Sequence, residues 1–555
     1  MLDSTGITQI AARKRVGIFF PFADLWTHQR AIHLLARRWS TESDITIVSC
    51  DAQRKSPCPA QRSLKLNEAS SPESRALVCK RCRASTELNP SIRYCSIGEY
   101  PVIPYELPRN LAGLLNFEID HQPLGKVALY DLLLTMKCAP QDIPESSIAA
   151  ISAAICDTTD IYFRMKKLLE KEQFDCLIVN NELYAMNSAA SLAARSLGID
   201  TFNLHLGDFR SQSDRSITIR PCGENYSQIS PGLDPTANRE SVVDQRFERL
   251  LRREYKNRFY GRNSLTYSPR SPRFRYRQER KAVTDQYRAS LILSSPDEQY
   301  TYRFVKGLSQ GDLSQVDIIN TFFAFAKSNP NEHFLVRLHP RLFSNRRDRN
   351  EASSAAMIRK ALDAAPPNVD LDGPPDFRPI LSVLRQSQVV VVSWSSLALD
   401  AAALGIPVVL GKKLGSPFAA VAVEVDGPSL HHLNEAIFRA ENRSPEEHQG
   451  RALDFWLYRW RQHRFASTLR IHFSPALLAL WVSTRFSLLG LEGLHAWLRK
   501  MELRYSPGFA QDSLELLPER FVLGNGLDQG RMATKENVGR RVSRPDVYRG
   551  LRGFL

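Results

Sequence analysis

The sequence predicts an α/β protein in which two Rossmann-like domains face each other across a cleft, with a helical C-terminal extension. Two regions, residues 1–220 and 286–445, alternate short strand-like runs with segments of helical pattern. The four consecutive valines at 389–392 are apolar on both faces, which is typical of a parallel strand covered on both sides. Residues 446–510 are mainly helical in pattern, and residues 511–555 form a polar, basic tail.

The first region has the pattern of a Rossmann-like unit with an insertion between its second and third strands. An amphipathic helix is predicted between the first two strands, and a later helix is expected to stop at Gly198. The strands are expected at residues 15–22, 44–51, 175–181 and 200–208, and the helices at residues 27–39 and 187–197.

The second region follows residues 221–285, which are rich in Arg, Pro and Tyr and are predicted to connect the domains. Within it, VVVVSWSSLALDAAALGIPVVL predicts a buried strand, a tight polar turn, a short helix stopped by Gly405 and Pro407, and a further strand. The strands are expected at residues 289–295, 333–340, 389–392 and 407–410, and the helices at residues 315–327, 351–364, 379–386, 397–404 and 429–441.

The composition favours anionic partners, because the 555 residues carry a formal net charge of +15. Much of the excess lies at residues 246–281 and in the tail from Arg531. No RNA-recognition, zinc-finger or helix-turn-helix pattern accompanies the charge, so no nucleic-acid partner is expected. The N-terminal sequence has no export signal and no apolar run long enough to span a membrane, so a cytoplasmic protein is expected.

The basic segments also predict peripheral attachment to the anionic inner face of the plasma membrane. Residues 473–498 include Trp481 and Trp497, which could anchor a helix in the membrane interface. Arg485 and Glu492 interrupt the apolar run, so a buried helix pair is the alternative interpretation.

Three strands of the second region end in polar turns, which contain SSPDE, RLHPR and SWSS. Because the carboxyl ends of parallel strands lie at one edge of a sheet, these turns are expected to meet in one crevice, where such sheets bind ligands. The helix start near Leu397 would offer N–H groups and a positive dipole end to phosphate. Ordinary capping by Ser395 or Ser396 is the alternative for the serines alone.

The residue types at this edge suit a nucleotide diphosphate. Arg337 can pair with phosphate, His339 can donate a hydrogen bond to a phosphate or leaving-group oxygen, and Asp400 can accept from ribose hydroxyls. Taken singly, His339 could instead cap a turn and Asp400 could be a solvated helix position. The predicted donor-nucleotide residues are Ser295, Arg337, His339, Ser393, Ser395, Ser396 and Asp400.

These motifs resemble a known group. Arg-x-His-Pro, followed some fifty residues later by Ser-x-x-x-x-Asp-Ala-x-x-x-Gly-x-Pro-Val, resembles the C-terminal domain of GT-B glycosyltransferases, and most nearly the bacterial capsule polysaccharide biosynthesis proteins. That set is related to Kdo transferases, CDP-glycerol glycerophosphotransferases and UDP-GlcNAc 2-epimerases. The resemblance is specific over residues 289–415 and weaker over residues 15–82 and 175–210. It implies a nucleotide-linked donor in the C-terminal domain and a polysaccharide or lipid-linked glycan acceptor in the N-terminal one.

The resemblance also distinguishes a retaining from an inverting mechanism of transfer. Many retaining members carry two Glu residues eight positions apart, the second of them in this helix. Here Asp400 takes the second position and Val392 the first, so the resemblance implies an inverting transfer of a sugar or polyol phosphate. Many relatives also carry Glu where this chain has Asp400, which leaves the ribose contact less secure.

An inverting transfer needs a general base on the acceptor hydroxyl. The glycerophosphotransferases use a histidine in a His-Gly turn, and NLHLGDF offers His205 with a spacing that differs by one residue. Asp208 and Glu182 are the other predicted catalytic residues. Asp24 and His28, which could otherwise cap the first helix, are predicted to bind the acceptor.

Two other functions fit the same residues. A nucleotide-sugar 2-epimerase would use the same scaffold without an acceptor. A non-catalytic scaffold of a polysaccharide assembly complex is the alternative of a different class, because of Asp400 and the inexact His-Gly turn. No cofactor is expected to be required for transfer if Arg337, His339 and the serine turn offset the phosphate charge.

Nine cysteines occur in a chain without an export signal, so disulfides are not expected. Cys50, Cys58, Cys79 and Cys82 follow the spacing C-x7-C-x20-C-x2-C, which predicts a structural metal site that holds zinc by default or an iron–sulfur cluster. The polar stretch between Cys58 and Cys79 is predicted as a loop that a metal would hold in place. Unliganded thiols are the alternative.

Overall fold

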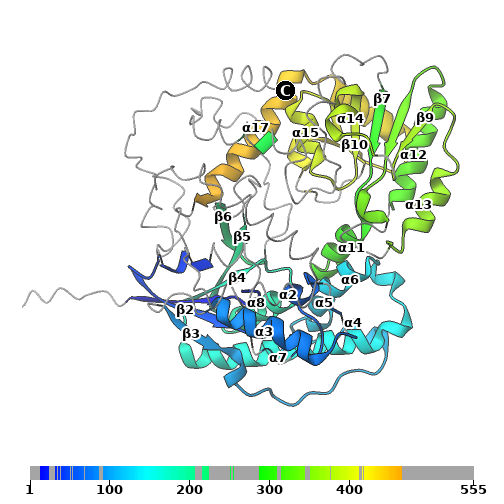
Figure 1. Ribbon diagram of the computed structural model, residues 1–555. Helices are drawn as coiled ribbons and strands as arrows, with labels where there is room; N and C mark the ends of the chain where they lie inside the picture. The colour runs from blue at the N-terminus through cyan, green and yellow to red at the C-terminus, as the bar shows by residue number, and fades with distance from the viewer. Residues whose placement is uncertain are drawn as a thin grey trace, which may run out of the picture.

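The computed structural model describes the greater part of two α/β domains (Figure 1), which confirms the predicted fold class. The predicted connector falls largely outside the described residues, as do the segment 473–498 and the basic tail. The described residues are 13–23, 32–33, 35–37, 39–50, 52, 54–64, 66–67, 69–86, 92–206, 216–223, 251, 254–255, 287–308, 314–343, 351–374, 377–411, 416 and 418–465.

The first domain is built on a seven-stranded sheet in the order β13-β6-β5-β4-β1-β2-β3. Strands β1 to β5 are parallel, and β6 pairs antiparallel with β5. The four predicted strands are confirmed, whereas the short β3 and β6 were not predicted. The strands are β1 Lys14–Phe19, β2 Ser43–Ser49, β3 Arg93–Ser96, β4 Cys176–Asn180, β5 Asp200–Leu206 and β6 Ser216–Pro221.

Helices surround this sheet, and the longest, α7, packs against α5 and α8. The loop predicted between Cys58 and Cys79 is wrong in part, because α2 and the first half of α3 lie within that stretch. Helix α3 is rich in helix-favouring residues and nearly lacks an apolar stripe, so its pattern gave no periodic signal. The helices are α2 Pro59–Arg62, α3 Pro72–Thr86, η1 Ile97–Glu99, α4 Leu111–Leu115, α5 Leu124–Ala128, α6 Tyr130–Met136, η2 Pro140–Asp142, η3 Glu145–Ser147, α7 Ile148–Glu172 and α8 Ala185–Ser196.

The second domain is built on a parallel six-stranded sheet in the order β12-β11-β10-β7-β8-β9. From β7 the chain adds strands on one side, and from β10 it adds them on the other, so the sheet has a switch point between β7 and β10. The strands are β7 Tyr287–Ile292, β8 Phe334–Arg337, β9 Val369–Asp372, β10 Ser387–Val392, β11 Val408–Leu410 and β12 Val423–Glu424.

Two apolar layers cover this sheet. One is formed with α12, α13 and α16, and the other with α14, α15 and α17, so the valines of β10 are buried from both faces. The predicted helices of this region are confirmed, and Ser429 caps α16 by accepting from the N–H of His432. The helices are α11 Pro296–Val305, α12 Gln315–Ser328, η5 Pro340–Leu342, α13 Ala355–Leu362, α14 Ile380–Gln386, α15 Leu397–Ala403, η6 Ala419–Val421 and α16 Leu430–Glu441.

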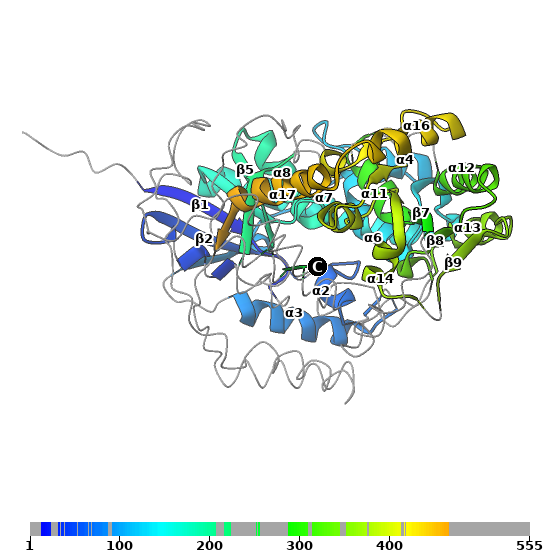
Figure 2. The same ribbon diagram turned by 90° about the horizontal axis from the view of Figure 1, so that it is seen from above.

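The chain then returns to the first domain. Helix α17, Pro445–Gln462, packs on α15 and leads into β13, His463–Phe465, which pairs antiparallel with β6. Figures 1 and 2 show α17 running from the second domain toward the strands of the first. The region predicted as a helical extension therefore begins as a helix and then adds a strand to the first sheet.

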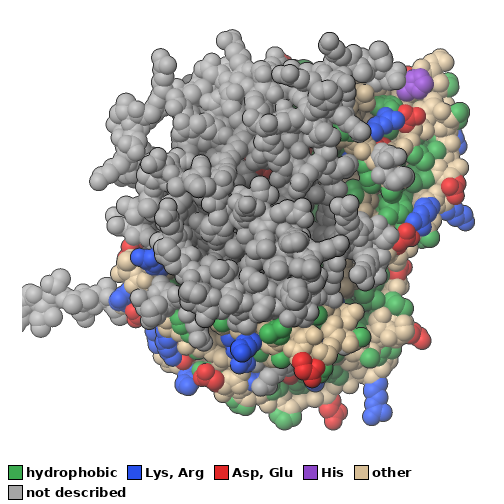
Figure 3. Space-filling view, in the orientation of Figure 1, with side chains coloured by type: hydrophobic (Ala, Val, Ile, Leu, Met, Phe, Trp, Pro, Cys, Tyr) green, Lys and Arg blue, Asp and Glu red, His purple; other side chains and the backbone are tan. Residues whose placement is uncertain are grey.

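Helices α6 and α11 pack on each other where the domains meet. On the face drawn in Figure 3, the described surface intersperses Lys and Arg with Asp and Glu rather than gathering one sign of charge. Among the described helices, none is long and apolar enough to cross a membrane.

Candidate functional site

Two serine turns meet at the switch point of the second sheet. Ser294 follows β7 and Ser393 follows β10, so both stand at the carboxyl edge where open α/β sheets bind ligands. The hydroxyl of Ser393 donates to the Oγ of Ser294 at 2.9 Å, and the N–H of Trp394 donates to the same oxygen at 2.8 Å. The ring of Trp394 also lies against that of Tyr302 in α11, with centroids 5.9 Å apart. The expected meeting of these turns is thus observed.

The hydroxyl that joins the turns belongs to Ser294 and not to the predicted Ser295. Ser295 is also buried, but its hydroxyl donates to the carboxylate of Asp297 in the first turn of α11. Adjacent residues of an extended segment point in opposite directions, so a one-residue choice between two serines cannot be made from the sequence.

Three backbone N–H groups at the start of α15 already donate hydrogen bonds within the protein. The N–H of Leu397 donates to the Oγ of Ser395 at 3.3 Å, and those of the next two residues donate to the carbonyls of Ser395 and Ser396 at 3.1 Å. Ser396 is the N-cap residue, with φ of −63° and ψ of −9°, and its side chain makes no cap hydrogen bond. The expectation of unused N–H groups for phosphate does not hold for these three residues.

His339 lies in the turn after β8, the strand next to β7. Its Nδ1 accepts a hydrogen bond from the N–H of Arg341 at 3.2 Å. Burial, reinforced by the nearby positive charge of Arg341, lowers the pKa of His339 to about 4. The ring is therefore neutral at physiological pH and carries its proton on Nε2, which makes it a hydrogen-bond donor without a formal charge.

Arg337 is held by groups of the second domain. Its guanidinium forms an ion pair with Asp372 of the neighbouring strand β9 and donates to the carbonyl of Arg378 at 2.8 Å. Burial lowers the pKa of Arg337 against the opposing influence of Asp372, and the residue is 2% exposed. These contacts commit part of the guanidinium to the sheet, and the phosphate role of Arg337 stays a prediction.

Asp400 is buried in the second domain. It lies in α15, which packs between β10 and α17, and only 2% of the residue is exposed. The ribose contact of Asp400 stays a prediction.

The His339 turn is held by a helix of the first domain. The guanidinium of Arg341 donates to the carbonyl of Leu134 in α6 at 2.8 Å and pairs with Asp297 of α11 at 2.9 Å. The Nζ of Lys137, at the end of α6, donates a hydrogen bond to the carbonyl of Arg341 at 2.9 Å. These contacts fix the turn relative to both domains.

Glu182 joins the domains as well. Its carboxylate accepts from the Nζ of Lys306, which follows α11, at 2.8 Å, and from the N–H of Gly223 at 2.7 Å. The two side chains of the ion pair are 11% and 14% exposed. Glu182 is thus committed to these contacts, which does not suit the general base that the sequence analysis considered.

Asp131, in the first turn of α6, is a site residue that the sequence analysis missed. It lies near Arg54, Arg62 and the N–H of Ala185, where α8 begins just after β4. Burial raises the pKa of Asp131 to about 6, although both arginines and this N–H act to lower it. Its Oδ1 is buried and accepts no hydrogen bond from the described residues.

This position is the switch point of the first sheet, because β1 and β4 are neighbours from which the chain proceeds to opposite sides. The sequence did hold a signal for Asp131. It is the single acid in the otherwise apolar stretch ALYDLLLTM, and a lone acid in such a stretch calls for a partner or a function.

The remaining predicted residues of the first domain are only partly visible. His205 lies in β5, where its backbone pairs with Thr218 of β6, and its side chain is outside the described structure. Asp24, His28 and Asp208 lie outside the described residues. The acceptor and base roles of these four residues stay predictions.

Cys50, Cys58, Cys79 and Cys82 line one cavity of about 20 Å³ in the first domain. None of the nine cysteines, all of which are described, is in a disulfide. No group of three His, Cys, Asp or Glu side chains in the described part of the chain is placed to hold a metal ion as it stands. The metal site stays a prediction.

No protein-family model and no curated protein sequence matches the chain. Several solved structures resemble it at low identity. UDP-GlcNAc 2-epimerase from Neisseria meningitidis bound to UDP-GlcNAc is 15% identical, with a TM-score of 0.28 over 79% of this chain and 94% of that one. The Thermosulfurimonas dismutans KpsC beta Kdo 2,7 transferase is 14% identical, with a TM-score of 0.31 over 59% and 89%. Acinetobacter baumannii MurG is 11% identical, with a TM-score of 0.28 over 80% and 95%. Likenesses at this level carry no functional argument.

Proposed function

We propose that the chain is a two-domain glycosyltransferase that moves a sugar or polyol phosphate, with inversion, from a nucleotide-linked donor to a surface or capsular polysaccharide acceptor. The observation that carries this proposal is the joined Ser294–Ser393 turn at the sheet switch point, with His339 in the adjacent turn. Hydroxyl and imidazole donors at such an edge suit a nucleotide diphosphate.

The donor half of the reaction needs groups that stabilise the departing diphosphate. His339 is neutral and protonated on Nε2, so it can donate to an oxygen that gains charge as the glycosidic bond breaks. A preorganised donor of this kind contributes most when it is held rigidly. The contacts of Arg341 with both domains supply that rigidity.

The acceptor half needs a general base. Asp131 is our first candidate, because it lies at the switch point of the first sheet and its Oδ1 accepts no hydrogen bond from the described residues. With a pKa near 6 it is ionised at pH 7 and still basic enough to take a hydroxyl proton. His205 remains the second candidate on the sequence pattern.

Nucleotide binding tests the donor site. Calorimetry with CMP, CDP, UDP and GDP is expected to identify one nucleotide that binds, and Ser294→Ala and His339→Ala are each expected to weaken it about tenfold. Ser290→Ala and His333→Ala are matched controls. Ser290 pairs with Ser387 on the same two strands, away from the carboxyl edge, and His333 is exposed at the opposite end of β8. Equal affinities for test and control variants would place the site elsewhere.

The same screen separates the alternative functions. If none of the four nucleotides binds, the non-catalytic scaffold is favoured over the transferase. If a nucleotide-sugar is converted to its C2 epimer without any acceptor, the chain is an epimerase. Transfer of labelled sugar to an acceptor polysaccharide, with no such epimer, supports the proposal.

Attachment to an anionic membrane surface is part of the proposal, because a lipid-linked acceptor would reside there. It rests on the basic residues 246–281 and the basic tail, which lie largely outside the described residues. Flotation with anionic liposomes should carry the protein at low salt and release it at high salt. Flotation that does not change with salt would contradict the electrostatic attachment.

A further inference from the structure

Four cysteines that are distant in the sequence line one small cavity. Cys50 follows β2, Cys58 is the N-cap residue of α2, and Cys79 and Cys82 lie three residues apart in α3, where helical spacing puts them on one face. The other five cysteines do not line this cavity. The described structure therefore brings together the same four thiols that the spacing of the sequence singles out.

One glutamine side chain forms hydrogen bonds with two of the cysteines that line the cavity. The backbone N–H of Cys58 donates to the Oε1 of Gln61 at 3.0 Å, and the Nε2 of the same side chain donates to the Sγ of Cys79 at 3.5 Å. Gln61 is 4% exposed. The Sγ of Cys82 donates to the carbonyl of Pro21, after β1, at 3.6 Å. These contacts tie both helices to the edge of the first sheet.

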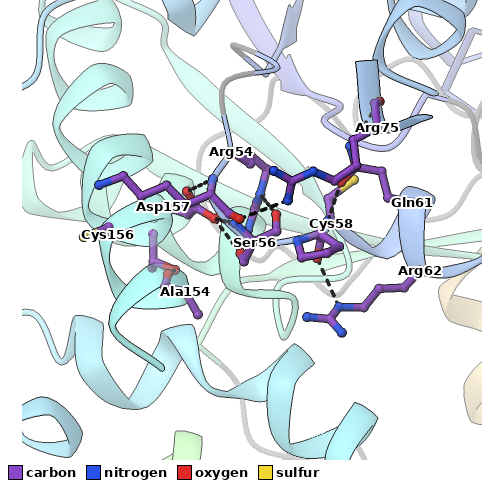
Figure 4. Close-up of polar contacts among 12 residues, drawn as sticks. Arg54, Ser56, Cys58, Gln61, Arg62, Arg75, Ala154, Cys156 and Asp157 are labelled. Carbon is purple, nitrogen blue, oxygen red and sulfur yellow. Dashed lines mark hydrogen bonds and ion pairs between the residues drawn. The ribbon is translucent and has the colours of Figure 1, made fainter. Parts of the chain in front are cut away.

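A buried cation stands beside the thiols. Arg54 lies next to Cys50 and Cys58 and pairs with Asp157 of α7 at 3.5 Å, where the two side chains are 9% and 2% exposed. Asp157 also accepts from the backbone N–H groups of Lys55 and Ser56 at 2.8 and 2.7 Å, which fixes the loop that carries Arg54. Figure 4 shows Arg54 and Ser56 converging on Asp157, with Cys58 alongside.

One nitrogen of this cation has no acceptor among the described residues. The Nη1 of Arg54 is buried and makes no hydrogen bond to the described residues. A buried guanidinium N–H without an acceptor is costly, and a thiolate would satisfy it. Four thiolates around a divalent ion leave two net negative charges, which a buried arginine offsets in part. The charge of the cavity wall thus suits a thiolate–metal centre.

Helix α3 buries few apolar side chains. Its fully buried residues are Val78, Arg81, Ser85 and Thr86, of which one is apolar. Most helices in proteins are held by the packing of an apolar face, and α3 has almost none. A metal ion bound by two cysteines of this helix would add an anchor to its hydrogen bonds with Gln61 and Pro21.

We propose that the cavity is a structural site for one zinc ion bound by Cys50, Cys58, Cys79 and Cys82. Binding draws the thiols inward by rotation about their side-chain torsions, because no three of them stand at ligand spacing in the described structure. Zinc is the ion that four cysteine thiolates most often bind as a structural site, and the metal analysis below distinguishes it from an iron–sulfur cluster. The ion fixes α2 and α3 to the end of β2.

Metal content tests the site independently of any transferase activity. The full-length protein, purified without chelator and supplied with zinc, should hold about one zinc per chain by mass spectrometry of the metal. Cys79→Ser and Cys82→Ser should each remove most of it. Cys95→Ser in β3 and Cys176→Ser in β4 are matched controls that should retain it, because neither residue lines the cavity.

A second measurement needs no variant. Alkylation of the wild-type protein should leave the four cavity cysteines protected until a chelator is added, and the same chelator should lower the melting temperature. Two results would overturn the proposal: no zinc bound above the buffer blank, or iron with sulfide in its place. Equal alkylation with and without chelator would overturn it as well.

Discussion

The Nζ of Lys306 lies 2.8 Å from a carboxylate oxygen of Glu182, and this ion pair joins the second domain to the first. Lys306 follows α11, and Glu182 follows β4 at the switch point of the first sheet. Both side chains are largely buried, so the pair forms only when the two domains are in the observed arrangement. The contact therefore reports on domain closure rather than on the stability of either domain alone.

Breaking this pair should weaken catalysis through domain closure. Lys306→Met and Glu182→Gln should each lower kcat/KM by a similar factor, of about five- to thirtyfold, because each leaves a partly buried partner that costs about 1–2 kcal/mol. Steady-state kinetics on both variants is the measurement. A general base at Glu182 would give a different result, in which Glu182→Gln abolishes turnover and Lys306→Met does not.

Arg337 and Asp372 should behave as a structural pair within the second sheet. Arg337→Met leaves a buried carboxylate without its cation, so the free energy of unfolding should fall by about 3–5 kcal/mol, and Asp372→Asn should cost a comparable amount. Chemical denaturation measures both. Arg359→Met is the control, because its pair with Glu351 is exposed and should show no measurable loss.

Nucleotide affinity then distinguishes the two roles considered for Arg337. In the folded fraction, Arg337→Met should bind the nucleotide as the parent does, since its guanidinium faces β9 and the carbonyl of Arg378. A large loss of affinity without a loss of stability would support the phosphate contact predicted from the sequence.

The partner of Arg337 shows why the sequence alone did not predict its ion pair. The run FLVR is apolar and predicts a buried strand, and the sequence analysis placed that strand correctly. Its neighbour β9, VDLD, is half exposed and charged, so the sequence pattern did not predict a strand there. The position of Asp372 opposite Arg337 was therefore not predicted either. An ion pair between strands is a property of the sheet order, which local pattern does not contain.

Other parts of the site likewise divide into features that a local sequence pattern predicts and features that it does not. The valines of β10 and the polar turn after them were predictable, because four β-branched residues next to serines carry a local signal. Asp131 and the Glu182–Lys306 pair depend on α6, α8 and α11 meeting between the domains. No periodicity within one segment specifies such a meeting.

Ser294 and Ser396 should respond differently to removal of the hydroxyl. Ser294→Ala removes the acceptor of two hydrogen bonds in a buried turn and should lower the free energy of unfolding by about 1–2 kcal/mol. Ser396→Ala should lose no helix-capping contribution, because its side chain makes no cap hydrogen bond in α15. Thermal or chemical denaturation of both variants measures this. A loss at Ser396 equal to that at Ser294 would mean that its hydroxyl has a structural role that the cap geometry does not account for.

Asp131 should make stability depend on pH between about 4 and 6. Its folded-state pKa is about 6, above the value of about 3.9 in an unfolded chain, so the protonated form is favoured by folding. The contribution is therefore fully present below pH 4 and is lost as the pH rises through 6. The full shift corresponds to about 3 kcal/mol, and partial solvent access reduces this to about 1–3 kcal/mol.

Asp131→Asn removes this titration and tests the proposed base at the same time. Relative to the parent, the variant should gain stability at pH 7 and not at pH 4, as measured by urea denaturation at each pH. Transfer should be abolished while nucleotide affinity is kept, because Asp131 lies in the first domain and Ser294 in the second. In the parent, kcat/KM should rise with pH with an apparent pKa near 6. Asp120→Asn is the control, since Asp120 is half-exposed and pairs with Lys166. Full transfer by Asp131→Asn would return the role of base to His205.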